Sequence, residues 1–187
     1  MAADTKDPLE CDGGIQLTAP EDTADQITSK TCSFWTKFPG FLPDPTAPFL
    51  KEFKRLANLE RWSTKDKRGY LVEALNSEID FHGDKSMGLV RWHRLCQEVG
   101  TGSAPTSVKG CKRVLYSRFV NLYSIVYYRR NPSISVVCFG SFRELARDIV
   151  RTGAFPRQCA KRDGCMRGLL KNRLVNNQAE YKRLIEA

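Results

Sequence analysis

Apolar residues recur at helical spacing along most of the chain. Phe49, Phe53 and Leu56 mark one face of a helix that starts near Thr46 and Pro48, and charged residues occupy its other face. The same periodicity predicts further helices over residues 64–81, 87–99, 106–119, 122–130, 142–151 and 156–163, and two short ones over 165–174 and 178–185. The pattern therefore predicts a mainly α fold, a compact multi-helix domain.

One segment reads as a strand. Residues 134–139 have the length and the β-branched residues typical of a strand. Because a lone strand leaves its backbone groups unpaired, either a partner lies within 117–127 or the segment is merely extended. Residues 122–130 are apolar almost all round, which favours a buried helix over a strand. We expect at most one short strand pair.

An aromatic and proline-rich segment precedes the first helix. Residues 34–45 contain four aromatic side chains and three prolines, which fix φ and exclude a helix. Rings of this size need burial, so we predict that the segment straps across the helices that follow. The alternative is that the aromatic rings of residues 34–41 dock on a partner protein.

The charge is distributed unevenly. Residues 1–33 carry seven acids and two lysines, and 34–187 carry a net charge of +14. The first segment lacks aromatic residues and predicts a disordered acidic tail, 1–33, before a single basic helical domain, 34–187. The tail could fold back as an electrostatic cover or remain solvated.

Several classes of protein are disfavoured by composition. No run of 18 apolar residues suggests a membrane span, and the N-terminus lacks the pattern of a secretory signal. Seven cysteines, an odd number, and the missing secretory signal together favour a reducing intracellular location. Within the cell we expect the nucleus in preference to the cytoplasm. Only two histidines, His82 and His93, are present, so we expect neither a metal nor another cofactor.

A catalytic reading has one candidate pair. His93 and Cys96 are three residues apart on one predicted helix, so their side chains can approach each other. Cys96 falls on the apolar stripe, where burial raises the pKa of a thiol and makes it inert. With no phosphate-binding loop or nucleophile-elbow motif in the chain, the sequence predicts a non-enzymatic protein.

The most informative functional feature is a stretch without carboxylates. No Asp or Glu occurs from Thr101 to Arg143, and aromatic residues such as Tyr116 and Tyr123 lie between the cations. A second basic cluster around 157–173 includes Arg167. This pattern predicts contact with a polyanion, DNA or RNA, because Lys and Arg bind phosphates. The predicted binding residues are Lys109, Lys112, Arg113, Arg118, Arg129, Arg130, Arg157, Lys161 and Arg162.

Two alternatives stay open. The helices over 87–99 and 106–119 could form a helix-turn-helix that turns Lys109, Lys112 and Arg113 outward, but their connector is longer than the usual turn, which favours a plain αα-hairpin. The domain could also be a protein-interaction or adaptor module without a nucleic-acid role. The polyanion hypothesis fails if acids from elsewhere in the fold lie among the cations.

A set of motifs resembles a known family. The chain carries a Phe-Pro pair at 38–39, an Asp-Pro-Thr-Ala-Pro-Phe run at 44–49, and Glu-Phe, Arg-Leu-Ala and Trp at 52–62. Trp92, Leu95-Cys96 and Val99-Gly100 continue the likeness, which spans roughly residues 34–170 and resembles a family of filamentous-fungal proteins for which no activity is known. The resemblance implies a lineage and no mechanism.

Overall fold

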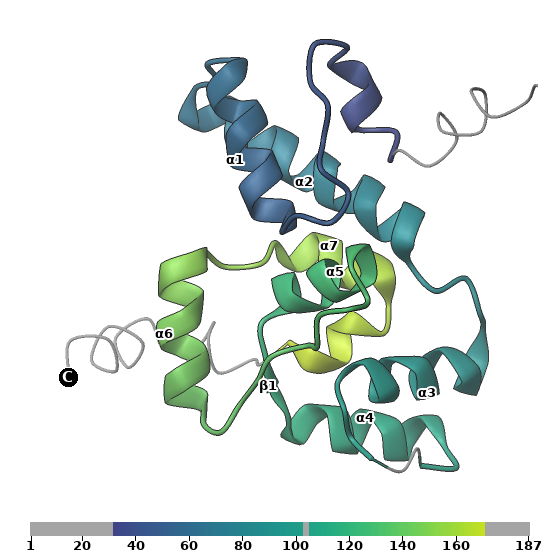
Figure 1. Cartoon of the computed structure of the whole chain (residues 1–187). Coiled ribbons are helices and arrows are strands. Elements are labelled where there is room, and N and C mark those ends of the chain that lie inside the picture. The colour runs from purple at the N-terminus through teal and green to yellow at the C-terminus, as the bar shows by residue number, and fades with distance from the viewer. Residues whose placement is uncertain (1–31, 103–104, 171–187) are drawn as a thin grey trace, which may run out of the picture. The chain divides into compact units, whose positions relative to one another are not determined.

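The computed structural model describes residues 32–102 and 105–170, and this part of the chain is mainly α (Figure 1). Its α-helices are α1 (Phe49–Leu59), α2 (Thr64–His82), α3 (Gly88–Glu98), α4 (Val108–Ser117), α5 (Leu122–Arg130), α6 (Phe142–Thr152) and α7 (Arg157–Asp163). Two 3₁₀ turns are η2 (Trp35–Lys37) and η3 (Met166–Leu169). The predicted fold class is confirmed.

Side-chain caps fix where most of the helices begin. The Ser63 hydroxyl accepts a hydrogen bond from the Asp66 backbone N–H, and the Asp66 carboxylate accepts one in return from the Ser63 N–H. Ser107, Asn121 and Ser141 each accept a backbone N–H in the same way at the start of α4, α5 and α6. The sequence therefore contains the start signals of α2, α4, α5 and α6.

Two predicted helix starts are wrong. Ser86 donates its hydroxyl proton to Asp84 instead of capping, and α3 begins at Gly88 without a side-chain cap. Thr46 donates to the Asp44 carboxylate within a turn, and α1 begins only after Pro48. In both cases the neighbouring aspartate competes for the hydroxyl side chain, and the helix begins one residue (α3) or two residues (α1) later than predicted.

The strand pair is shorter than the sequence suggests. β1 (Phe119–Val120) pairs antiparallel with β2 (Cys138–Phe139), so the partner does lie within 117–127 as predicted. Only the last two residues of the expected strand 134–139 join the ladder. α6 packs against both strands, because the chain turns directly from β2 into it.

The aromatic segment packs on its own domain. Phe34, Trp35 and Phe41 are buried, with the rings of Trp35 and Phe41 stacked at 5.7 Å. The Trp35 indole N–H donates to Glu78 Oε1 of α2 at 2.6 Å. The predicted strap is therefore confirmed, and the partner-docking alternative for these rings loses its basis.

The described domain starts slightly earlier than predicted. Cys32 is buried and its thiol donates to the Ser77 hydroxyl at 3.0 Å, so Cys32 and Ser33 belong to the folded body. The rest of the predicted tail, 1–31, lies outside the described residues, as do 171–174 and the predicted helix 178–185. Of the predicted helix 165–174, the described part forms the 3₁₀ turn η3.

Helix packing brings α7 and η3 next to α2 and α4. α5 packs against α1 and α2, and its residues Leu122, Ile125 and Val126 are buried. α7 packs on α2, η3 packs on α7 and on α4, and α3 and α4 form a hairpin beside them (Figure 1). None of the helices in the described ranges is long and apolar enough to cross a membrane.

Candidate nucleic-acid interface

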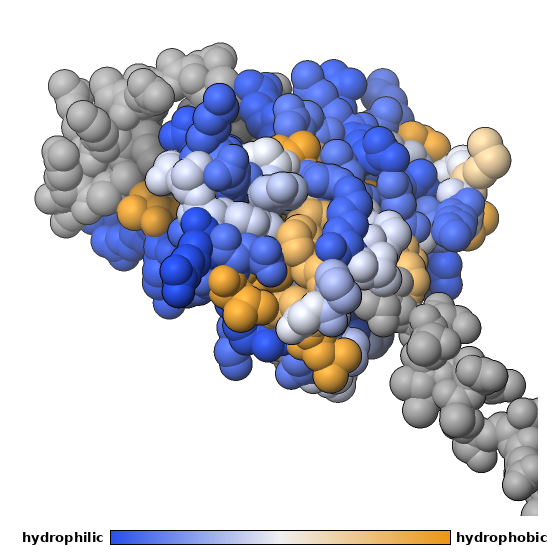
Figure 2. Space-filling model, turned by 90° about the horizontal axis from the view of Figure 1, so that it is seen from above, coloured by the Kyte–Doolittle hydropathy of each residue, from blue (hydrophilic) through white to orange (hydrophobic). Residues whose placement is uncertain are grey.

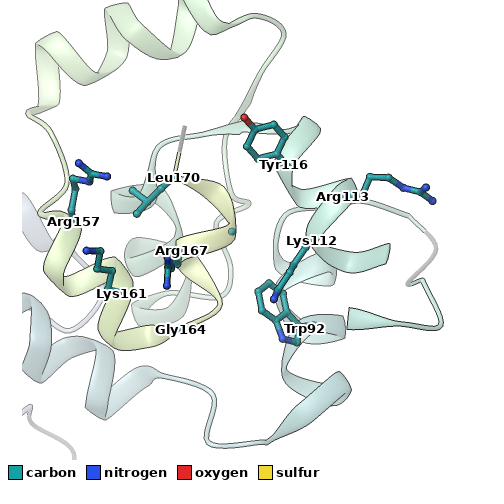
Figure 3. Close-up of a pocket in the computed structure, with 10 residues that line it drawn as sticks. Trp92, Lys112, Arg113, Tyr116, Arg157, Lys161, Gly164, Arg167 and Leu170 are labelled. Atoms are coloured by element: carbon teal, nitrogen blue, oxygen red, sulfur yellow. The ribbon is translucent and has the colours of Figure 1, made fainter. Parts of the chain in front are cut away.

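A cavity of about 800 Å³ lies between the α3–α4 hairpin and the α7–η3 unit (Figure 3). We call it the cationic cavity, because five of its described lining residues are Lys or Arg and none of the described ones is acidic. Its lining consists of Trp92, Lys112, Arg113, Tyr116, Arg157, Lys161, Gly164, Arg167, Gly168 and Leu170.

The amphipathic pattern of two helices builds the opposing walls. On α7, Cys159 and Ala160 face the core, which leaves Arg157 and Lys161, four residues apart, on the cavity side. On α4, burial of Cys111 and Leu115 likewise turns Lys112 and Tyr116 to the cavity. Figure 3 shows the two sets on opposite sides, with the Arg113 side chain turned away.

A tight turn sets the position of η3. Gly164 follows α7 with a φ of +77°, a backbone conformation that residues with a Cβ rarely adopt, and the chain reverses there. The Asp163 carboxylate then accepts the backbone N–H of Met166 at 2.8 Å, which starts η3. A Cβ on Gly168 would lie 3.2 Å from the Trp92 ring, so glycine permits η3 to approach α3.

Trp92 holds Lys112 at the edge of the cavity. The Lys112 ammonium lies over the Trp92 ring, 5.1 Å from its centre, in a cation–π contact. Such contacts are worth about 0.5–1 kcal/mol at exposed sites. Trp92 is half-buried and packs against the core, so it fixes the position of an otherwise flexible cation.

Four of the cavity cations lack a counter-charge within the protein. Among the residues that the structure describes, Lys112, Arg157, Lys161 and Arg167 form no ion pair with a carboxylate. Like charges on facing walls repel each other and raise the local positive potential. An anion that enters the cavity would relieve this repulsion.

Arg129 does not belong to the interface. Its side chain is only 7% exposed and holds the Glu98 carboxylate with two nitrogens, while a third nitrogen donates to Asp163 Oδ2 at 3.0 Å. Burial raises the pKa of Glu98, and the Arg129 guanidinium opposes that shift. Folding brings these acids from α3 and α7, so Arg129 is neutralised inside the domain and cannot reach a phosphate.

Arg130 is likewise excluded from the interface. Its side chain is 2% exposed, pairs with Glu78 of α2, and donates to the backbone carbonyls of Ala47 and Asp44 at 3.2 and 2.8 Å. Arg130 therefore fastens the segment before α1 to the helices beneath it. The sequence-based prediction that Arg129 and Arg130 bind nucleic acid is wrong on geometric grounds.

The other predicted cations fall into three groups. Arg162 is exposed but pairs with Asp80 of α2 at 2.7 Å, and Lys109 and Arg118 lie outside the cavity lining. Four predicted residues line the cavity, Lys112, Arg113, Arg157 and Lys161, although the Arg113 side chain turns away from it (Figure 3). The predicted set lacked Trp92, Tyr116 and Arg167. The spacing of Tyr116 four residues after Lys112 was the one sequence signal that could have linked a ring to a cation.

The catalytic candidate is excluded. Cys96 is 1% exposed and burial raises the pKa of its thiol, while His93 Nε2 is 2.7 Å from the Pro105 carbonyl oxygen. Cys96 and His93 therefore share no open cleft. Among the described residues, no three His, Cys, Asp or Glu side chains gather closely enough to hold a metal ion.

The face shown in Figure 2 is mostly hydrophilic, with its apolar residues in small groups.

Comparisons with protein-family models, curated protein sequences and solved structures gave no match. The resemblance to filamentous-fungal proteins thus stays a prediction.

Proposed function

We propose that this domain is a non-enzymatic binding module for a polyanion, DNA or RNA, and that the cationic cavity is its phosphate-binding site. The observation that supports this best is the convergence of four cations from α4, α7 and η3 on one concavity, where they meet no carboxylate partner within residues 32–102 and 105–170. Such a ligand fits the predicted intracellular, nuclear location.

The chemistry of the lining suits phosphate oxygens. Arg157 and Arg167 can each donate two parallel hydrogen bonds to one phosphate, and Lys112 and Lys161 supply point charges. Since no protein carboxylate neutralises these four cations within the described part, their charge is balanced by solvent ions, which are released when phosphates replace them. Counterion release is the main driving force of sequence-independent nucleic-acid binding.

Salt dependence tests the proposal. Four phosphate contacts give a slope of log affinity against log salt of about −3, so affinity should fall roughly 60-fold between 50 and 200 mM salt. Fluorescence anisotropy of labelled oligonucleotides with the full-length protein measures this slope. An affinity that barely responds to salt would contradict phosphate binding and would favour the adaptor alternative.

A matched pair of triple variants separates the cavity from net charge. Replacing Lys112, Arg157 and Lys161 by Gln should reduce the slope to about −1 and lower the affinity at 100 mM salt by at least tenfold. The control variant replaces Lys51, Lys65 and Lys85 by Gln; these are exposed, form no ion pair among the described residues and do not line the cavity. Equal losses in both variants would mean that overall charge, and not the cavity, attracts the ligand.

A further inference from the structure

We infer that the cationic cavity holds the phosphorylated end of a nucleic-acid strand, with Arg167 as the residue that binds the terminal phosphate. This inference rests on the proposed function and specifies the ligand of the same site. Three observations carry it: the ion pairs that flank the cavity, the number of cations that line it, and the position of Arg167 between its walls.

The cations next to the cavity on α3 and α7 are neutralised by the protein itself. Arg91 of α3 pairs with Asp163 at 3.3 Å, and Arg162 of α7 pairs with Asp80 at 2.7 Å. A protein that binds a continuous strand follows its backbone with a row of accessible cations. On these two sides a strand that passed through the cavity would meet ion pairs, whereas a strand that ends in the cavity needs cations only there.

The cations of α4 do not extend the site as a row either. Lys112 lies on the cavity side over the Trp92 ring, 5.1 Å from the ring centre. Arg113 turns away from the cavity (Figure 3), and Lys109 is exposed outside its lining. Of these three cations, only Lys112 adds its charge to the interior of the cavity. The available positive charge is therefore concentrated at one place.

The number of cavity cations matches the charge of a phosphorylated terminus. Lys112, Arg157, Lys161 and Arg167 have no carboxylate partner in the described part of the chain. A phosphate monoester carries roughly −1.5 to −2 charges at pH 7 and presents three acceptor oxygens, whereas an internal phosphodiester carries one charge. A terminal phosphate and the next two internucleotide phosphates thus bring about four negative charges.

The size of the cavity suits an end of a strand. Its volume of about 800 Å³ lies within the range of pockets that enclose small molecules, about 300–1,000 Å³. Charged walls on facing sides of such a space strengthen the local field, and a ligand with its charge concentrated at one point gains most from it.

Arg167 is the cation best placed for the terminal phosphate. In Figure 3 its side chain lies between Lys161 of α7 and Lys112 of α4. Its backbone is held in η3, because Asp163 accepts the Met166 N–H at 2.8 Å. A guanidinium donates two parallel hydrogen bonds to a phosphate, whereas an ammonium acts as a point charge.

Oligonucleotides that differ only at their ends test the inference. The probes are a short oligo-dT with a 5′-phosphate, the same oligo-dT with a 3′-phosphate, and a hydroxyl-ended oligo-dT one nucleotide longer, which carries the same number of phosphates. With the full-length protein, at least one phosphorylated end should bind roughly tenfold tighter than the hydroxyl-ended probe, as expected for added charge-assisted hydrogen bonds. Fluorescence anisotropy at each end shows which terminus supplies the phosphate.

A matched pair of variants tests the role of Arg167. In Arg167→Gln the preference for the phosphorylated end should fall from roughly tenfold to roughly twofold or less. The control, Arg113→Gln, makes the same change of charge at a lining residue whose side chain turns away, and it should keep the preference. Because the preference compares two ligands on one protein sample, a change in the folded fraction cancels.

The ionisation of the ligand provides a second test. The second pKa of a phosphate monoester is about 6, so the terminal phosphate loses most of its second charge between pH 7.5 and 5.5. The preference for the phosphorylated end should therefore decrease over this range. The affinity for the hydroxyl-ended probe, whose phosphodiesters stay charged, should not change.

The outcomes separate the inference from the proposed function. Equal affinities for all three probes, or a preference that Arg167→Gln keeps, would overturn the inference while leaving polyanion binding intact. Competition by inorganic tripolyphosphate as effective per phosphate as the phosphorylated oligo-dT would also overturn it, since a site for compact phosphates needs no nucleic-acid end. Binding of none of the probes at about 50 mM salt would overturn both, because counterion release favours binding most at low salt.

Discussion

The same carboxylate-free stretch supplies arginines and lysines to two regions with opposite properties. At the end of α5, Arg129 and Arg130 are buried and paired with Glu98, Asp163 and Glu78. Around the cationic cavity, Lys112 of that stretch, with Arg157 and Lys161 of α7, has no carboxylate partner within the described residues. Both regions are rich in Lys and Arg and poor in acids along the sequence. In one region the cations stabilise the fold, and in the other they are exposed to a ligand.

The difference lies in the acids that tertiary structure brings near. A buried guanidinium is tolerated only when a carboxylate and further hydrogen bonds replace its lost water, and Arg130 has Glu78 and two backbone carbonyls for this purpose. An exposed lysine or arginine needs no protein partner, because water solvates it. A count of cations along a sequence therefore overestimates the cations that a ligand can reach.

The largest expected effect is on stability, at Arg130. Arg130→Met leaves the buried Glu78 carboxylate without its cation and should lower the free energy of unfolding by about 3–5 kcal/mol. Arg157→Met, at the cavity, should change it by less than about 0.5 kcal/mol. Urea denaturation followed by circular dichroism measures both.

A double variant keeps this comparison testable if Arg130→Met fails to fold. Glu78→Gln with Arg130→Met removes the unpaired charge and retains an acceptor for the Trp35 N–H, so it should recover part of the stability. Similar costs for Arg130→Met and Arg157→Met would show that the two regions do not differ as the geometry indicates.

An intermediate loss of stability is expected for substitutions of Asp163, which contacts both the buried ion pairs and η3 at the cavity. Its carboxylate accepts from Arg129 and Arg91 and from the Met166 backbone N–H that starts η3. Asp163→Asn removes the charge but keeps an acceptor for Met166, so stability should fall by about 1.5–3 kcal/mol while nucleic-acid affinity changes less than about threefold.

Asp163→Ala sharpens the same comparison. It removes the acceptor as well, which releases the start of η3 and with it Arg167, and it should weaken oligonucleotide binding more than Asp163→Asn does. Equal affinities of the two variants, measured by anisotropy below their unfolding temperatures, would show that the cavity does not depend on this hydrogen bond.

The smallest expected effect is the change in the free energy of unfolding with pH. Burial lowers the pKa of His82, with Glu78 opposing the shift and Arg130 and Arg129 adding to it. Because the folded-state pKa lies below the unfolded value, the unfolded chain takes up more protons as pH falls through about 6.5, and the free energy of unfolding should decrease from pH 7.5 to 5.5. Binding through Lys and Arg, which stay charged in this range, should not change.

Replacing His82 tests whether this residue causes the loss of stability at low pH. In His82→Gln the decrease in unfolding free energy between pH 7.5 and 5.5 should become smaller, as measured by urea denaturation at each pH. A pH dependence equal to that of the unsubstituted protein would assign the decrease to other groups. A binding affinity that varied with pH in the same range would place a titrating group in the cavity.

The sequence by itself determined the helices, most of their caps and the strap. The stripe of Phe49, Phe53 and Leu56 and the start signals of α2, α4, α5 and α6 depend on residues within a few positions of one another, so local physics suffices for them. The buried aromatic residues at 34–41 followed from the same reasoning, since rings next to prolines must find an apolar partner.

Only the tertiary structure decided which cations remain available. Glu78 lies 52 residues before Arg130, and Asp163 lies 34 residues after Arg129, so no local pattern could reveal their ion pairs. The meeting of α4 with η3, which joins Trp92, Lys112 and Arg167 in one cavity, depends in the same way on long-range packing. Charge neutralisation acts through space, and the order of residues along the chain does not record which acids and bases become neighbours.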